Sequence, residues 1–159
     1  MNLILWRHAE AADGSDDFNR ALTKRGRKQA LRMAAWLAGR LPSDCRILVS
    51  PTVRTRQTAE ALGLPYDICS EIAPAATAND LFVASGWPDG ARKDRDKDRS
   101  SVLLVGHQPA LGGLLALLLS GEPAAWSMRK GSICWLQNRQ REGGTQTFLR
   151  AVMPVDLLD

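Results

Sequence analysis

The chain contains only two histidines, and each stands close behind a short apolar run. His8 comes two residues after the run 3–6, and His107 comes two residues after the run 102–105. Apolar runs of this length predict buried strands. Because ligands of open α/β sheets bind beyond the carboxyl ends of the strands, we expect the two imidazoles to lie together at such an edge.

Two arginines are expected beside these histidines. Arg7 directly precedes His8. A third apolar run, 47–49, is followed by Ser50 and Pro51, which predict the start of a helix. Arg54 falls in the first turn of that helix. Guanidinium groups match the oxygens of phosphate, and a helix N-terminus adds positive potential, so this cluster predicts a phosphate pocket. Zinc would need further ligands, and the sequence has neither an HExxH pair nor clustered cysteines, so we expect no metal and no cofactor.

These residue types suit phosphoryl transfer, which depends mainly on positioning and on electrostatic stabilisation of the transferring oxygens. Surrounding cations disfavour an imidazolium and lower its pKa, so we expect His8 to be neutral and nucleophilic near pH 7. Its attack would give a phosphorylated histidine that water then hydrolyses. His107 would hydrogen-bond the transferring oxygens. Each residue alone is more typical of an ordinary packed or surface position, so the hypothesis depends on their conjunction.

Strands and helices that would position these residues alternate over most of the chain. Three apolar runs predict buried strands, at residues 3–6, 47–49 and 102–105. Three helices are predicted, the first between a cap at Thr23 and the stop at Pro42, the others over residues 51–62 and 110–119. This alternation predicts an α/β fold, a three-layer α/β/α sandwich with a mostly parallel central sheet and some antiparallel strand.

The remaining segments are less regular. Residues 10–22 are typical of a polar loop, and residues 65–82 have room for one short helix. Residues 86–101 are charged and contain glycine and proline, which predicts a mobile loop at the rim of the pocket. The runs 132–136 and 147–152 predict two strands joined by a loose turn.

Length and composition favour a single domain over residues 1–159, because a chain that is 45% hydrophobic can bury a real core. No apolar run is long enough to cross a bilayer, and three widely spaced cysteines predict a reducing, cytoplasmic location. The net charge of +4 would suit nucleic acid or a small anion. Aspartates nearly balance the basic stretch 92–99, so we expect a solvated surface there and neither nucleic acid nor a membrane as a partner.

Four ordered motifs extend from residue 7 to residue 109. They are Arg7-His8-Ala9-Glu10, Asn19-Arg20-Ala21-Leu22-Thr23-Lys24-Arg25-Gly26, Ser50-Pro51 with Arg54, Gln57 and Thr58, and Val105-Gly106-His107-Gln108-Pro109. Together they resemble the histidine phosphatase superfamily, which is phosphoglycerate mutase-like, and within it the small SixA-type phosphohistidine phosphatases. The resemblance implies a three-layer α/β/α fold, His8 as nucleophile, and phosphate-pocket roles for Arg7, Arg54 and His107.

A proton donor for the leaving group is not evident in the sequence. Larger members of the superfamily supply a glutamate from an inserted segment. Glu10, Glu71 and Asp80 are weak candidates here, because each is more typical of a structural or surface position. A P–N bond to a protonated imidazole already has a good leaving group, whereas a phosphate ester benefits from a positioned acid. A donor-poor site therefore favours phosphohistidine.

We therefore expect a metal-independent phosphatase with a phosphohistidine intermediate on His8, acting on protein phosphohistidine, for example on a histidine-containing phosphotransfer protein. One alternative is a phosphomonoesterase for a small phosphorylated metabolite, which a carboxylate over the pocket would favour. The other is a non-catalytic module that binds phosphate or a phosphopeptide. The sequence does not indicate the oligomeric state.

Overall fold

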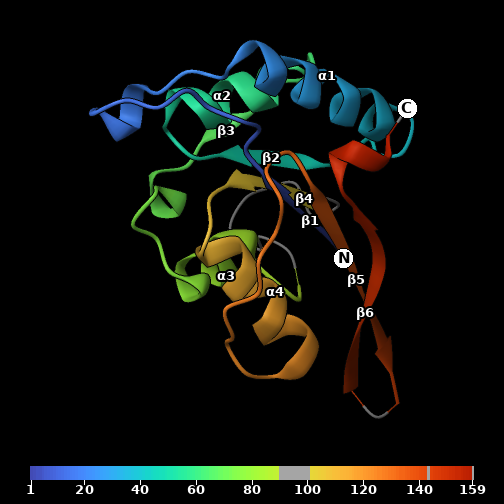
Figure 1. Ribbon diagram of the computed structural model, residues 1–159. Coiled ribbons are helices and arrows are strands. Elements are labelled where there is room, and N and C mark those ends of the chain that lie inside the picture. Colours follow the sequence, from blue (N-terminus) through green and yellow to red (C-terminus); the bar gives the residue numbers. More distant parts are fainter. Residues whose placement is uncertain (90–100, 143, 159) are drawn as a thin grey trace.

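The computed structural model describes residues 1–89, 101–142 and 144–158, and one mixed sheet lies at its centre (Figure 1). In spatial order the strands are β3 (Asp67–Ile68), β2 (Arg46–Val49), β4 (Ser101–Gly106), β1 (Asn2–Arg7), β5 (Ile133–Arg141) and β6 (Gly144–Met153). The four strands from β3 to β1 are parallel, whereas β5 and β6 each run antiparallel to their neighbours. The mostly parallel sheet with an antiparallel end is therefore confirmed.

The central strand β1 shows how the layers arise. Because side chains alternate across a strand, Leu3 and Leu5 face one side of the sheet, and Ile4 and Trp6 face the other. The leucines pack in a core with residues of α3 (Ala78–Ser85) and α4 (Ala110–Ser120). Ile4 and Trp6 pack with residues of α1 (Lys24–Ala38) and α2 (Val53–Glu60). Figure 1 shows one helix pair on each side of the sheet, so the predicted three-layer sandwich is confirmed.

Capping residues set the helix ends. Thr23 caps α1 as predicted, because its hydroxyl accepts a backbone N–H of the first turn at 2.9 Å. The start of α2 differs from the prediction, since the cap is Thr52 and Pro51 lies outside the helix. Both α1 and α2 end slightly before the predicted positions. Gly121, at φ +83°, adopts the left-handed conformation that ends α4.

Other departures lie at the edges of the molecule. The edge strand β3 is too short to leave an apolar pattern, and it was not predicted. The tail strands β5 and β6 are longer than predicted and form an arm that projects from the sheet (Figure 1). The expected loop 86–101 was partly wrong, because Trp87 is buried in the core and Ser101 already belongs to β4. Residues 90–100 of that segment lie outside the described residues.

Single turns of 3₁₀ helix complete the structure: η1 (Asp17–Asn19), η2 (Ser70–Ile72) and η3 (Val155–Leu157). The first of them lies in the polar loop 10–22, which a bridge between Ala11 and Leu22 closes. Within the described ranges, no helix combines the length and the apolar character needed to cross a bilayer.

Candidate active site

The carboxyl ends of β1 and β4 bring the two histidines together. The strands are parallel neighbours with Arg7 opposite Gly106, and the N–H of His8 donates to the carbonyl of Gly106 at 3.1 Å. The imidazole centroids of His8 and His107 are 5.2 Å apart, and the rings are inclined by 56°. Both side chains are buried. The site therefore lies where parallel α/β sheets commonly bind ligands.

The neighbouring strand β2 supplies the third component. It ends beside β4, where the N–H of Ser50 donates to the carbonyl of Val105 at 3.1 Å. The cap at Thr52 then starts α2, which places the buried Arg54 in the first turn. Its Nη2 lies 3.3 Å from Nδ1 of His107. The structure thus brings Arg54 to the histidine pair.

Arg7 approaches the site from the last position of β1. Its Nη1 donates to the carbonyl of Met128, and burial lowers the pKa of this half-buried guanidinium. Among the described residues, neither Nε of Arg7 nor Nε of Arg54 has a hydrogen-bond acceptor, although both atoms are buried. An unsatisfied buried donor costs on the order of 1–3 kcal/mol. Two such donors favour an oxyanion, which would supply the missing acceptors.

The surroundings of His8 make it a neutral nitrogen base. Its Nδ1 lies 2.7 Å from the carbonyl of Ala9, and a carbonyl only accepts, so Nδ1 carries the proton and Nε2 carries the lone pair. Burial lowers the pKa of His8 from 6.5 to about 4. The positive charges of Arg54, Arg7 and Lys130 contribute to this shift, and the hydrogen bond to Ala9 opposes it. Near pH 7, Nε2 is therefore free to act as a nucleophile.

His107 is neutral as well, and its partners define its tautomer. Burial is the main cause that lowers its pKa to about 3. The neighbouring His8 and Arg54 act in the same direction, and the carboxylate of Asp17 opposes them. Arg54 can only donate, so Nδ1 of His107 accepts from it. Nε2 then carries the proton and donates to the hydroxyl of Ser50 at 2.7 Å. His107 thus donates to Ser50 and accepts from Arg54.

Sequence reasoning missed Asp17. Its Oδ2 lies 2.9 Å from Nη2 of Arg54, and its backbone carbonyl accepts from Nη1 of the same guanidinium. Hydrogen bonds from Arg20 and then from Arg54 lower the pKa of Asp17, so the group remains a carboxylate. Nothing in the sequence distinguishes it from Asp13 and Asp16 on the same loop.

The other motif residues shape the backbone around His8. Thr58 Oγ1 accepts from the N–H of Ala9 at 3.1 Å, and Gln57 Oε1 accepts from the N–H of Leu22 at 2.8 Å. Gly26 is required because a Cβ there would lie 1.9 Å from the carbonyl oxygen of Glu10. The motifs outside the histidines thus hold the segment that follows β1.

The three carboxylates considered as proton donors have other partners. Glu10 accepts from the hydroxyl of Thr23 at 2.8 Å. Asp80 forms the capping box of α3 with Thr77. Glu71 lies beside Cys69, whose Sγ is 3.3 Å from its Oε2. These contacts explain each carboxylate as a local structural group.

Comparison with known proteins agrees with this geometry. Residues 3–75 match the model of the histidine phosphatase superfamily (branch 1). The chain is 34% identical over 126 residues to phosphohistidine phosphatase SixA of Escherichia coli (strain K12), covering 77% of this chain and 76% of that protein. The chain belongs to the histidine phosphatase superfamily. Another relative within it, the SixA homolog of Haemophilus influenzae, is 33% identical over 132 residues, covering 74% of this chain and 77% of that protein.

Solved structures of the superfamily have the same fold. The protein histidine phosphatase SixA complexed with tungstate superimposes with a TM-score of 0.75 at 28% identity, and the match covers all of both chains. A mycobacterial glucosyl-3-phosphoglycerate phosphatase matches with a TM-score of 0.66 at 20% identity, covering 94% of this chain and 97% of that one. At that identity the second likeness concerns the fold alone.

Proposed function

We propose that this chain is a phosphohistidine phosphatase that removes the phosphoryl group from a phosphorylated protein, with His8 as nucleophile. The observation that carries the proposal is the neutral His8 imidazole, with its lone pair on Nε2, beside His107 and two arginines whose buried Nε donors lack acceptors in the described part of the chain. The names of the SixA relatives support phosphohistidine as the substrate. The tungstate bound by the SixA structure supports a site for a tetrahedral oxyanion.

The first step transfers the phosphoryl group to His8. The lone pair of Nε2 forms a bond to phosphorus while the P–N bond of the substrate breaks, and the electron pair of that bond returns to the leaving nitrogen. A substrate ring protonated on its other nitrogen departs as neutral imidazole. Arg7 and Arg54 hold the phosphoryl oxygens and compensate their charge.

His107 contributes a further hydrogen bond after a change of tautomer. To donate to a phosphoryl oxygen, it must carry its proton on Nδ1. The hydroxyl of Ser50 can then donate to Nε2, because a hydroxyl both donates and accepts.

The second step regenerates the enzyme. Water attacks phosphorus, the P–N bond to His8 breaks, and its electron pair returns to Nε2. The proton lost by water passes to the released phosphate. No metal takes part in either step of this proposal.

The carboxylates near the site favour phosphohistidine over phosphate esters. Asp17 is the carboxylate in contact with Arg54, and its lowered pKa makes it a poor proton donor. An ester would benefit from such a donor, whereas a protonated phosphohistidine would not. A phosphomonoesterase for a small metabolite is therefore the second candidate.

We further propose that residues 1–159 form one domain and that this domain works in the cytoplasm. The three free cysteines support the cytoplasmic location.

A side-by-side assay tests the function. We expect a phosphorylated histidine-containing phosphotransfer domain and free phosphohistidine to be hydrolysed faster than a panel of sugar and nucleotide monophosphates, with no effect of chelators. His8→Ala should abolish turnover, and Arg54→Ala should lower kcat by about 10²- to 10³-fold, as for other lost oxyanion donors. Faster hydrolysis of an ester would favour the second candidate, and unchanged turnover by the His8 variant would refute the mechanism.

A further inference from the structure

An apolar groove lies between α4 and the β5–β6 arm. It has a volume of about 500 Å³, and its walls include Leu115 and Leu119 of α4. Three large apolar side chains are exposed along it, with exposed fractions of 43% for Trp126, 45% for Leu149 and 53% for Val152. Clustered exposed apolar side chains commonly mark interaction sites.

A β-bulge builds one wall of this groove. Leu149 pairs with Leu136, and Val152 pairs with Cys134, so Arg150 is an extra residue in β6. In a regular strand, residues three apart face opposite sides. The bulge instead puts Leu149 and Val152 on one face, the side on which α4 packs. Bulges commonly redirect side chains in this way.

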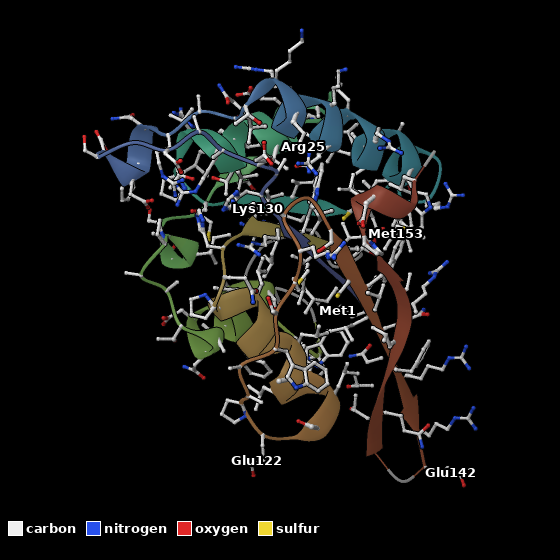
Figure 2. All side chains as sticks on the ribbon, viewed as in Figure 1. Met1, Arg25, Glu122, Lys130, Glu142 and Met153 are labelled. Atoms are coloured by element: carbon white, nitrogen blue, oxygen red, sulfur yellow. The ribbon has the colours of Figure 1, made fainter. Side chains whose placement is uncertain are left out.

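The segment after α4 connects the groove to the candidate active site. Trp126 lies in the groove, the carbonyl of Met128 accepts from Arg7, and the N–H of Gly131 donates to the carbonyl of His8. Figure 2 shows Glu122 and Lys130 at opposite ends of this segment. Trp126 and Gly131 are five residues apart, so the groove and the contact with His8 are separated by at most about 18 Å, the span of five extended residues. A helix of about twelve residues has the same length. One docked helix is therefore long enough to reach from the groove to His8.

Positive charge lies between the groove and the catalytic histidine. A second hollow of about 460 Å³ shares Ser127, Met128 and Arg129 with the groove. The charged residues that line this hollow are Arg7, Arg25, Arg129 and Lys130, together with Glu10 and Asp156. Arg129 pairs with Asp156 at 2.5 Å, and Arg25 lies 3.7 Å from Glu10, which leaves Arg7 and Lys130 as the cations in excess. The excess of cations favours an occupant that carries carboxylates beside its apolar side chains.

We propose that the groove docks an amphipathic helix of the phosphohistidine-bearing protein, with its apolar stripe against Trp126, Leu149 and Val152. A carboxylate of that helix faces Lys130, and its phosphohistidine reaches His8. This inference rests on the proposed function. It predicts that the groove contributes to the turnover of a phosphorylated protein and contributes nothing to the turnover of a small phosphohistidine.

The test compares two substrates and three variants. The substrates are a phosphorylated histidine-containing phosphotransfer domain and free phosphohistidine. Trp126→Ala and Leu149→Asp alter the groove, and Leu31→Asp is the control on α1, where the leucine is 59% exposed. Since truncating an interface anchor costs more than about 1 kcal/mol, we expect kcat/KM for the phosphoprotein to fall about tenfold in the groove variants. Free phosphohistidine, and both substrates in the control, should change less than about twofold, within the scatter of surface substitutions.

Every other result of this assay has a separate interpretation. Unchanged turnover of the phosphoprotein by the groove variants overturns the docking proposal and leaves the proposed function standing. An equal loss for both substrates also overturns it, because the defect is then in the fold or the chemistry. A dimer in solution that Leu149→Asp dissociates assigns the groove to a second copy of this chain and overturns it too. Failure of the unaltered protein to hydrolyse either substrate overturns the proposed function as well.

Discussion

At the scale of single residues, the environment of each imidazole decides what it can do. His8 and His107 are the same residue type, yet one binds a backbone carbonyl through Nδ1 and the other meets Arg54 through Nδ1. Both are neutral near pH 7 because burial disfavours the imidazolium. Their hydrogen-bond partners therefore distinguish the proposed nucleophile from the proposed phosphate ligand.

Acidification should destabilise the protein through these histidines. The pKa of His8 is 6.5 when unfolded and about 4 when folded, so between pH 6.5 and pH 4 the unfolded state binds a proton that the folded state does not. Stability is therefore intact above pH 6.5 and is lost as the pH falls toward 4. At about 1.4 kcal/mol per pKa unit, His8 should account for about 2.5 kcal/mol of this loss by pH 4.5.

Urea unfolding at pH 7 and pH 4.5 measures this effect. His8→Asn should lose less stability than the unaltered protein between the two pH values, by about the amount assigned to His8. Each protein is compared with itself at the two pH values, so effects of the substitution that do not depend on pH cancel. An equal loss in both proteins would show that the pKa of His8 is not lowered.

Asp17 should compete with anions for Arg54. Its carboxylate and its backbone carbonyl accept hydrogen bonds from the two terminal nitrogens of the guanidinium. An ion pair with an exposed carboxylate is worth about 0.2–1 kcal/mol, so Asp17→Asn should tighten tungstate binding about 1.4- to fivefold in calorimetry. Asp13→Asn on the same loop is the control for net charge. Weaker binding by the Asp17 variant would show instead that Asp17 orients Arg54 for the anion.

At the scale of elements, α1 lies in close contact with the segment after β1. A Cβ at position 26 would collide with the backbone of Glu10, which cannot move without shifting the residues next to His8. We expect Gly26→Ala to destabilise the protein by about 1–3 kcal/mol or more, as overpacking usually does, and to lower activity.

Gly39→Ala is the matched control for this prediction. Gly39 follows the same helix at φ −88°, and its Cβ would meet nothing within 4 Å. The exchange should change stability by less than about 1 kcal/mol, in the stabilising direction. Both free energies come from denaturant unfolding. A Gly26 variant as stable as the control would mean that the backbone of Glu10 can move to accommodate the Cβ at little cost in stability.

Elements with strong local signals could be predicted, and those without them could not. The three buried apolar runs correctly predicted β1, β2 and β4, and Thr23 correctly predicted the start of α1. By contrast, β3 forms only because a strand edge is available to pair with. The bulge at Arg150 and the burial of Trp87 depend on partners far along the chain. The placement of His8, His107 and Arg54 followed from strand ends, whereas the Asp17 contact needed the conformation of a loop.

At the scale of the whole molecule, sheet order decides how the candidate site is assembled. The strand that leads to His8 lies between β4 and β5, whose residues come from the second half of the chain. A chain that ends at residue 131 lacks β5 and β6, so β1 becomes an exposed edge, and such edges promote aggregation. We expect this truncated chain to be insoluble and inactive, as centrifugation and turnover assays would show. A soluble, active fragment would contradict this role of the tail.

The central position of β1 also sets the order of events during synthesis. Arg7 and His8 emerge early from the ribosome, but the strand that leads to them cannot acquire both neighbours until β5 has been made. A nascent chain therefore carries its reactive imidazole in a half-built sheet for most of translation. Enzymatic competence should thus appear abruptly and late, as a property of the finished polypeptide.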